Sequence, residues 1–151
     1  MGLAPQDPFA HALLAIALEA TGKHAESLEQ AQAAENLPGM FIVGGNLSGV
    51  FCRLGRPESA QGILRQMEAA EKAGMYVSPL DISMAQLALG DKTKGIARLR
   101  DAVNERGFNV TYNIIDPVFD VVREDAAFAS LMEEMHLPRA AWHDFPRYLK
   151  R

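Results

Sequence analysis

The sequence predicts an all-α fold in which three pairs of helices stack into a right-handed superhelix, with further helices capping its C-terminal end. Turn-type residue pairs occur at Thr21-Gly22, Leu54-Gly55 and Leu89-Gly90. The three glycines are 33 and 35 residues apart, and each lies between two runs of helical pattern. Two helices in a period near 34 residues are typical of a helical solenoid.

The three periods share one plan of small and large side chains when they are aligned on their turn glycines. Large aliphatic residues stand eight positions before the glycine: Leu14, Leu47 and Ile82. Small residues stand seven before and five after it: Ala15, Ser48 and Ser83, then Ser27, Ala60 and Gly95. Small residues let the two helices of a pair approach closely, and larger ones fill the seam to the next pair.

Helix starts are indicated by an oxygen-bearing residue followed by proline, at Asp7-Pro8, Ser78-Pro79 and Asp116-Pro117. The side-chain oxygen can accept a free backbone N–H, and proline at the first helical position has no N–H to leave unbonded. Asp81, three residues after Ser78, is expected to complete a capping box. The predicted helices cover residues 8–21, 24–36, 40–54, 57–73, 79–89, 92–106, 117–122 and 124–135.

A single domain, residues 1–151, is expected. Its predicted parts are repeats at about 8–39, 40–74 and 76–107, a C-terminal cap at 112–137 and a tail at 138–151. The last pair of a solenoid has an open apolar face that needs a cover. Phe119, Phe128, Leu131 and Met132 can supply it.

Over residues 8–106 the period and the small/large alternation resemble the tetratricopeptide repeat family. The common aromatic residue near the start of the first helix is replaced by His11, Gly44 and Pro79. The bulky residue usual four positions before the glycine is Gln86 in the third repeat. The resemblance implies a superhelix that binds proteins or peptides.

The C-terminal third is similar to the closing segment of tetratricopeptide regions in bacterial multidomain signalling proteins, including cyclases and winged-helix transcription activators. The segments that carry this resemblance are 76–81, 89–91, 116–120 and 122–125, with Phe128 and Leu131. It implies a sensor or homo-oligomerisation module of a larger bacterial regulator, which is the alternative function.

Composition excludes several classes of protein. The formal charge of −4, from 15 basic and 19 acidic residues, argues against direct binding of nucleic acid. The N-terminal residues do not form a signal peptide, and the apolar runs are too short or too interrupted by glycine to cross a bilayer. No membrane span and a cytoplasmic location are therefore expected. Cys52 is the only cysteine, so no internal disulfide can form.

No motif for catalysis or metal binding is apparent, so we expect no enzyme activity, cofactor or metal. The four histidines are far apart in the sequence, and Cys52 is interpreted as a half-buried thiol rather than a nucleophile. The run 44–49 contains three glycines but lacks the Lys-Ser/Thr ending of a phosphate loop. These glycines indicate close helix contact or, alternatively, a surface against which a ligand lies.

The first helices of the pairs project a mostly apolar trough on the inner face of the superhelix. Its predicted partner-binding residues are Phe9, Ile16, Glu19, Ile42, Gly45, Gly49, Arg53, Leu80, Met84 and Leu87. A contiguous apolar patch marks an interaction site, and an amphipathic helix or an extended peptide would suit this one. The sequence therefore predicts a non-catalytic scaffold for a protein or peptide partner. Two alternatives stay open: the chain's own tail, residues 138–151, covers the trough, or a second copy does so in a homodimer.

Overall fold

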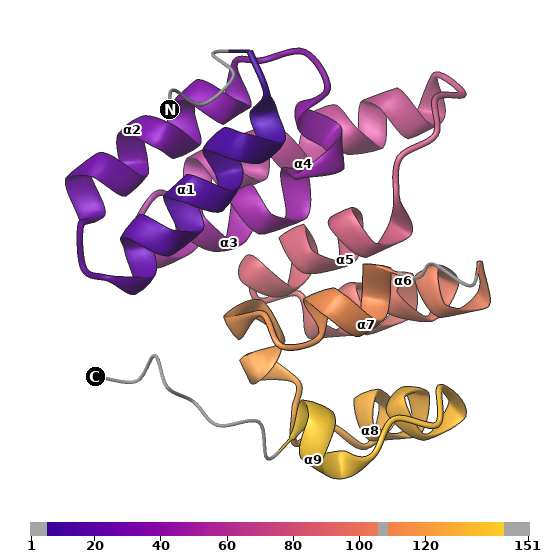
Figure 1. The fold of residues 1–151 in the computed structure, drawn as a ribbon. Helices are drawn as coiled ribbons and strands as arrows, with labels where there is room; N and C mark the ends of the chain where they lie inside the picture. The colour runs from indigo at the N-terminus through magenta and orange to yellow at the C-terminus, as the bar shows by residue number, and fades with distance from the viewer. Residues whose placement is uncertain (1–5, 106–108, 144–151) are drawn as a thin grey trace.

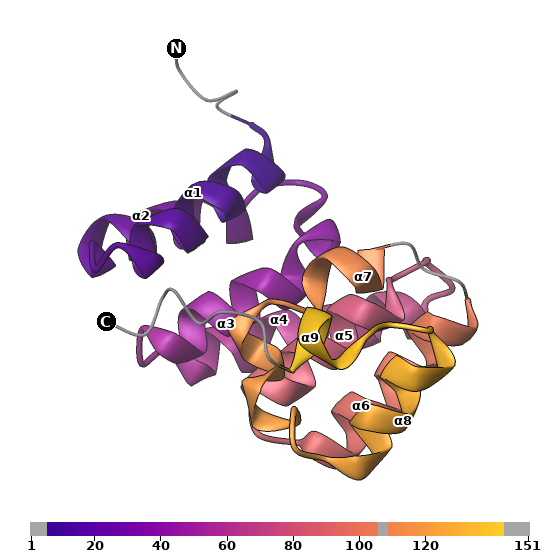
Figure 2. The same ribbon diagram turned by 60° about the horizontal axis from the view of Figure 1, so that its bottom comes forward.

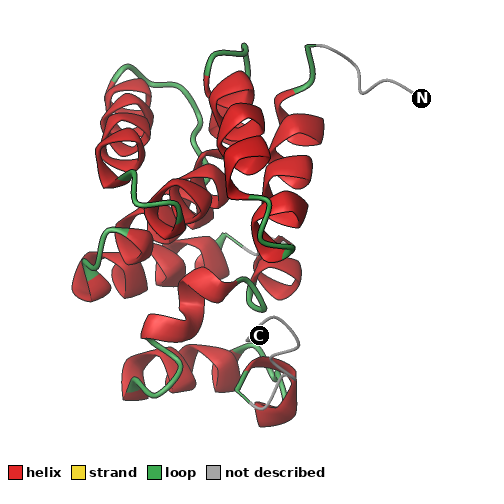
Figure 3. Ribbon diagram, turned by 90° about the vertical axis from the view of Figure 1, so that its left-hand side faces the viewer, coloured by secondary structure: helices red, strands yellow, loops and turns green. Residues whose placement is uncertain are grey.

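The computed structural model describes residues 6–105 and 109–143 of the chain. Every element of regular secondary structure in these residues is a helix (Figures 1 and 3). The predicted all-α class is therefore confirmed. Within the same residues, no helix is both long enough and apolar enough to cross a bilayer. The predicted positions 106–108 and 144–151 lie outside the described residues.

The helices follow the predicted order closely. They are α1 (Pro8–Ala20), α2 (His24–Glu35), η1 (Met40–Ile42), α3 (Gly44–Arg53), α4 (Pro57–Lys72), α5 (Pro79–Ala88), α6 (Lys92–Asn104), α7 (Asn109–Asn113), η2 (Pro117–Val121), α8 (Ala126–Glu134) and α9 (Arg139–Trp142). The predicted helix 40–54 is interrupted at Val43, whose φ of −132° is not helical. Helix α7 lies between the predicted helices 92–106 and 117–122, where no helix was predicted; Val110 of α7 and Ile114, which follows it, are four residues apart and both buried.

The six long helices pack as the pairs α1–α2, α3–α4 and α5–α6, and the first helix of each pair also contacts the first helix of the next (Figure 1). Each pair turns at a glycine with a left-handed backbone, at Gly22, Gly55 and Gly90, with φ of +78°, +73° and +87°. Glycine adopts this conformation without the penalty that a Cβ would bring. The N–H after each glycine bonds back into the helix, as Lys23 does to the Leu18 carbonyl at 2.9 Å. This is the hydrogen bond of a Schellman motif.

The small positions predicted inside each pair are points of close backbone approach. Ser27 Oγ of α2 donates to the Ala15 carbonyl of α1 at 2.7 Å. In the third pair the serine lies on the other helix, and Ser83 Oγ of α5 donates to the Gly95 carbonyl of α6 at 2.7 Å. Both serines are fully buried, so the hydroxyl needs this partner. A serine on either helix therefore serves the same contact.

Helix α5 separates two apolar clusters. One face of α5, with Ile82 and Ala85, packs against the first two pairs together with Val77, which precedes the helix. Its other face carries Leu80, Met84 and Leu87, which pack with α6 and the C-terminal elements. Figure 2 shows α7, α8 and α9 on the same side of the molecule as α5 and α6. All residues from Pro79 to Leu87 are buried as a result.

The C-terminal elements are held by a buried arginine. The Arg123 guanidinium donates to the Asp120 carboxylate at 2.7 Å and to the carbonyls of Ile114, at 3.1 Å, and Trp142. The Trp142 ring meets Phe128 edge to face, with centroids 5.6 Å apart. The four residues predicted to cover the last pair are all fully buried in the second cluster: Phe119, Phe128, Leu131 and Met132. An arginine so placed leaves its charge compensated and its donors satisfied.

Candidate functional site

The structure divides the ten residues of the predicted trough into a buried half and an accessible half. The buried half consists of Gly45, Gly49, Leu80, Met84 and Leu87. The accessible or partly accessible half consists of Phe9, Ile16, Glu19, Ile42 and Arg53. The two halves need separate treatment, because a fully buried side chain cannot contact a partner.

The three α5 residues of the trough are not on an open face, and this part of the prediction is wrong. Leu80, Met84 and Leu87 are 4%, 1% and 1% exposed and pack in one cluster with Val118 and Phe119 of η2. The segment that follows α6 returns over α5 and covers it. The cover is η2, which belongs to the predicted cap 112–137 and not to the tail 138–151 that was the alternative cover.

The glycines of α3 permit close contact between helices and do not form an open surface against which a ligand could lie. A Cβ at Gly44 would lie 2.7 Å from Met67 Sδ, and one at Gly45 would lie 2.9 Å from the Asp81 Cα. At Gly49 a Cβ would lie 3.1 Å from Arg53 Nη1. Real Cβ atoms do not come as close as the first two distances, so glycine is required where α4 and α5 meet the start of α3.

Asp81 is a buried acid that bonds across two helices. Its Oδ1 accepts the Gly45 N–H at 3.0 Å, which satisfies a donor at the N-terminus of α3. The Ser78 side chain makes no cap bond to a backbone N–H of α5, so the predicted capping box is incomplete, although the Ser78 hydroxyl bonds to the Asp81 carboxylate. Burial raises the pKa of Asp81 to about 6, against the lowering effects of the Gly45 N–H and the Ser78 hydroxyl. This carboxylate has a structural partner in α3.

Glu19 and Arg53, predicted to orient a partner, are paired with each other. Arg53 Nε lies 2.9 Å from Glu19 Oε2, and Arg53 Nη1 lies 3.9 Å from Asp116 Oδ1. Asn46 Nδ2 donates to Asp116 Oδ2 at 3.3 Å. Burial raises the pKa of Asp116, and the Val118 N–H and Arg53 oppose this. These four residues form a polar cluster that joins α1, α3 and the start of η2.

Three exposed apolar side chains remain at the N-terminal end of the predicted trough. Phe9 is 50% exposed, Leu13 is 51% exposed and Ile42 is 65% exposed. Phe9 and Leu13 are one turn apart on α1, and η1, which carries Ile42, contacts α1. We call these three residues the apolar stripe. Leu13 was not among the predicted residues, although its spacing of four from Phe9 places it on the same helical face.

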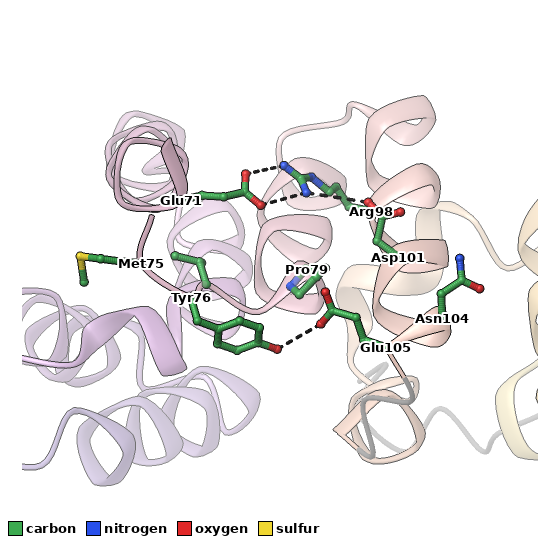
Figure 4. A pocket seen from close by; sticks show the side chains of 9 residues that line it. Glu71, Met75, Tyr76, Pro79, Arg98, Asp101, Asn104 and Glu105 are labelled. Atoms are coloured by element: carbon green, nitrogen blue, oxygen red, sulfur yellow. Dashed lines mark hydrogen bonds and ion pairs between the residues drawn. The ribbon is translucent and has the colours of Figure 1, made fainter. Parts of the chain in front are cut away.

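A second candidate site, which the sequence did not indicate, is a cleft of about 340 Å³ between α4 and α6 (Figure 4). We call it the α4–α6 cleft. Its lining residues come from the end of α4, the link to α5, the first residue of α5, and α6 with its C-cap: Glu71, Met75, Tyr76, Val77, Pro79, Arg98, Asp101, Asn104 and Glu105. Gly74 predicted the end of α4 but gave no sign that the link would meet α6.

Two polar bridges cross the cleft, one at each end (Figure 4). The Arg98 guanidinium donates to both carboxylate oxygens of Glu71, at 3.0 Å and 2.6 Å. The Tyr76 hydroxyl donates to Glu105 Oε2 at 3.2 Å. Partial burial, followed by the Glu105 carboxylate, raises the pKa of the Tyr76 phenol. The phenol therefore stays protonated and neutral at physiological pH.

Groups for nucleophilic or metal chemistry are not assembled in the described part of the chain. No three side chains of His, Cys, Asp or Glu among residues 6–105 and 109–143 are placed to hold a metal ion. Burial raises the pKa of the Cys52 thiol, and the neighbouring Arg53 only partly opposes this. A protonated thiol is a poor nucleophile. His11 bonds to Gln30 at 2.7 Å, which pairs it between α1 and α2.

Comparisons of the chain with protein-family models, with curated proteins and with solved structures find no match. The contacts given above define three candidate surfaces: the apolar stripe, the polar cluster beside it and the α4–α6 cleft.

Proposed function

We propose that this chain is a non-catalytic scaffold of the tetratricopeptide type, a right-handed superhelix that binds a protein partner through the apolar stripe. One observation carries the proposal. Phe9, Leu13 and Ile42 are large apolar side chains, at least half exposed, on two elements in contact. A group of this kind marks an interaction surface more often than a solitary exposed residue does.

The chemistry of α1 supports an apolar partner. Its only ionisable side chains are His11, bonded to Gln30, and Glu19, paired with Arg53. Burial of a large apolar side chain contributes roughly 1.5–3 kcal/mol when it is complete, and about half of that remains available at Phe9 and Leu13. An amphipathic helix with apolar residues at a spacing of three or four would match this face.

The repeat geometry supports the tetratricopeptide type. The turn glycines recur at 33 and 35 residues, each pair turns with the same backbone, and the serine contact recurs in the first and third pairs. Identical supersecondary units stacked on their neighbours are the defining property of such superhelices.

The proposal is tested by comparing two single substitutions of exposed apolar residues. Leu13→Asp lies in the stripe, and Val121→Asp, at a side chain 44% exposed in η2, is the matched control. A partner captured from source lysate and then purified should bind the Leu13→Asp variant at least about tenfold more weakly than the wild type, because a charge would be buried in the contact. Calorimetry with the purified partner measures this. Equal affinity of wild type and Leu13→Asp would exclude the stripe as the binding surface.

A second candidate is self-association, as in an oligomerisation or sensor module of a larger bacterial signalling or transcription regulator. The uncharged stripe favours it, because two identical neutral apolar faces can meet without repulsion. Sedimentation velocity at several concentrations distinguishes the candidates. A dimer that becomes a monomer in Leu13→Asp supports self-association, and a monomer at all concentrations supports an external partner.

A further inference from the structure

We propose that the α4–α6 cleft binds the side chain of an arginine presented by a protein partner. This site involves the second helices of the pairs and shares no residue with the apolar stripe. It is therefore independent of the function proposed for the stripe.

The charge of the cleft is the first argument. Its lining contains three carboxylates, on Glu71, Asp101 and Glu105, and one guanidinium, on Arg98. The bidentate contacts of 3.0 Å and 2.6 Å neutralise Arg98 with Glu71. Asp101 lies 3.8 Å from Arg98 and is 54% exposed, and Glu105 accepts its hydrogen bond from the neutral Tyr76 hydroxyl. Among the residues that the structure describes, these two carboxylates therefore have no full counter-charge.

The shape and the other lining side chains are the second argument. Val77 and Pro79 are buried and give the cleft an apolar wall, and Met75 and Tyr76, 54% and 78% exposed, stand at its opening. Figure 4 shows Tyr76 and Glu105 at one end and Asp101 with Asn104 on the α6 side. An aliphatic stem can lie on the apolar wall, with its charged end between the Tyr76 ring and the two carboxylates.

A guanidinium suits this arrangement better than a metal ion or an ammonium group. A metal ion needs several converging ligands, and no three such side chains converge in the described residues. An ammonium group is a compact, strongly hydrated charge, whereas a guanidinium is planar, stacks on aromatic rings and can donate to two carboxylates at once. Asp101 of α6 and Glu105, the helical-region C-cap residue of α6, are four residues apart, so they lie on one side of that helix end.

The test uses the peptide Ac-Ala-Arg-Ala-amide and the same peptide with citrulline, which keeps the shape of arginine and removes its charge. Binding is followed by amide chemical shifts of the whole chain in ¹⁵N spectra. The arginine peptide should cause saturable shifts at Tyr76, Asp101 and Glu105, with a dissociation constant of roughly millimolar order. The citrulline peptide should bind at least about fivefold more weakly, since exposed ion pairs contribute up to about 1 kcal/mol each.

Variants locate the site. Asp101→Asn combined with Glu105→Gln should abolish the shifts, and Tyr76→Leu, which retains both carboxylates, should weaken binding about threefold through loss of ring stacking. Glu29→Gln combined with Glu58→Gln removes the same charge from exposed positions outside the cleft and should leave binding unchanged. Equal binding of the two peptides, or equal weakening by the control variant, would overturn the proposal. So would shifts caused by Mg²⁺ but not by the arginine peptide.

Discussion

Leu13 of α1 and Asp81 of α5 occupy the same position in two repeats, nine residues before the turn glycine, yet their environments are reversed. The leucine is 51% exposed and the aspartate is 9% exposed. Residue polarity alone would predict the opposite. Helix α5 lies between α3 and η2, whereas Leu13 of α1 keeps about half of its side chain exposed beside η1. The elements packed against a helix therefore decide which of its residues are buried. A polar residue that becomes buried in this way must find a hydrogen-bond partner, as Asp81 does in the Gly45 N–H.

The same contrast appears four residues earlier in each repeat, at positions in α1, in η1 and just before α5. Thirteen residues before the glycine stand Phe9, Ile42 and Val77, which are 50%, 65% and 4% exposed. Only the third of these positions is closed by neighbours on both sides. The seam beside α5 is thus closed by neighbouring elements, whereas the equivalent side chains of the first two repeats stay exposed and belong to the apolar stripe.

The largest expected effect contrasts two leucines on these helices. Leu87→Ala in α5 should lower the free energy of unfolding by about 3–5 kcal/mol, because a fully packed side chain is lost and a cavity remains. Leu13→Ala in α1 should lower it by less than about 1 kcal/mol, because half of that side chain is already in water. Urea denaturation of both variants measures the difference.

Both variants replace a leucine by alanine, so each is the control for the other. Similar losses in both would mean that Leu13 is packed in solution, for example against a second copy. In that case the loss at Leu13 should decrease on dilution, whereas the loss at Leu87 should not.

The next effect concerns the buried acid. Burial raises the pKa of Asp81 from its ordinary value of 3.8 to about 6, so the folded state binds this proton more tightly than the unfolded state does. The associated stability is fully present below pH 3.8 and is lost as the pH rises through about 6. Asp81→Asn keeps an acceptor for the Gly45 N–H without the charge. It should therefore be more stable than the wild type by about 2–3 kcal/mol at pH 8, with the difference falling toward zero at low pH.

Urea denaturation of wild type and Asp81→Asn at several pH values between 4 and 8 measures this difference directly. Between the two pKa values, the slope of the difference against pH should correspond to about one proton per molecule. Asp101→Asn, at an exposed carboxylate, is the control and should show no comparable gain. A variant that is less stable than wild type at pH 8 would mean that the charge of Asp81 stabilises the start of α3 more than burial penalises it.

The sequence predicted the helices well because their limits are set locally. Asp7, Asp91 and Asp116 cap the helices that follow them, and left-handed glycines end the helices before the turns. The residues that cover the last pair were predicted, but that η2 would lie over the trough face of α5 could not be predicted in the same way. It depends on the path of residues 109–122, which is fixed by long-range contacts such as Arg123 to Ile114 and Asn46 to Asp116. The sequence therefore predicted which faces were apolar but not which of them would stay open.

The α4–α6 cleft was missed for a related reason. Tyr76 and Glu105 are 29 residues apart, and no motif contains both of them. Their meeting depends on how the link after α4 crosses toward α6. The interior glycines of α3, by contrast, were a readable signal of close packing, because each costs helix stability unless a neighbour requires the space.

The smallest effect tests that close packing with two Gly→Ala substitutions of opposite sign. At Gly45 a Cβ would lie 2.8 Å from Met84 Cβ and 2.9 Å from the Asp81 backbone, neither of which can rotate away. Gly45→Ala should therefore destabilise the fold by about 1–3 kcal/mol through overpacking against α5. At Gly62, inside α4, a Cβ would meet nothing within 4 Å, so Gly62→Ala should stabilise by up to about 1 kcal/mol through helix propensity alone. Thermal unfolding of both variants gives the signs. If Gly45→Ala left the stability unchanged, α3 and α5 would be able to move apart at this contact. Asp81 and the α5 face that meets α3 would then be less tightly packed than the structure shows.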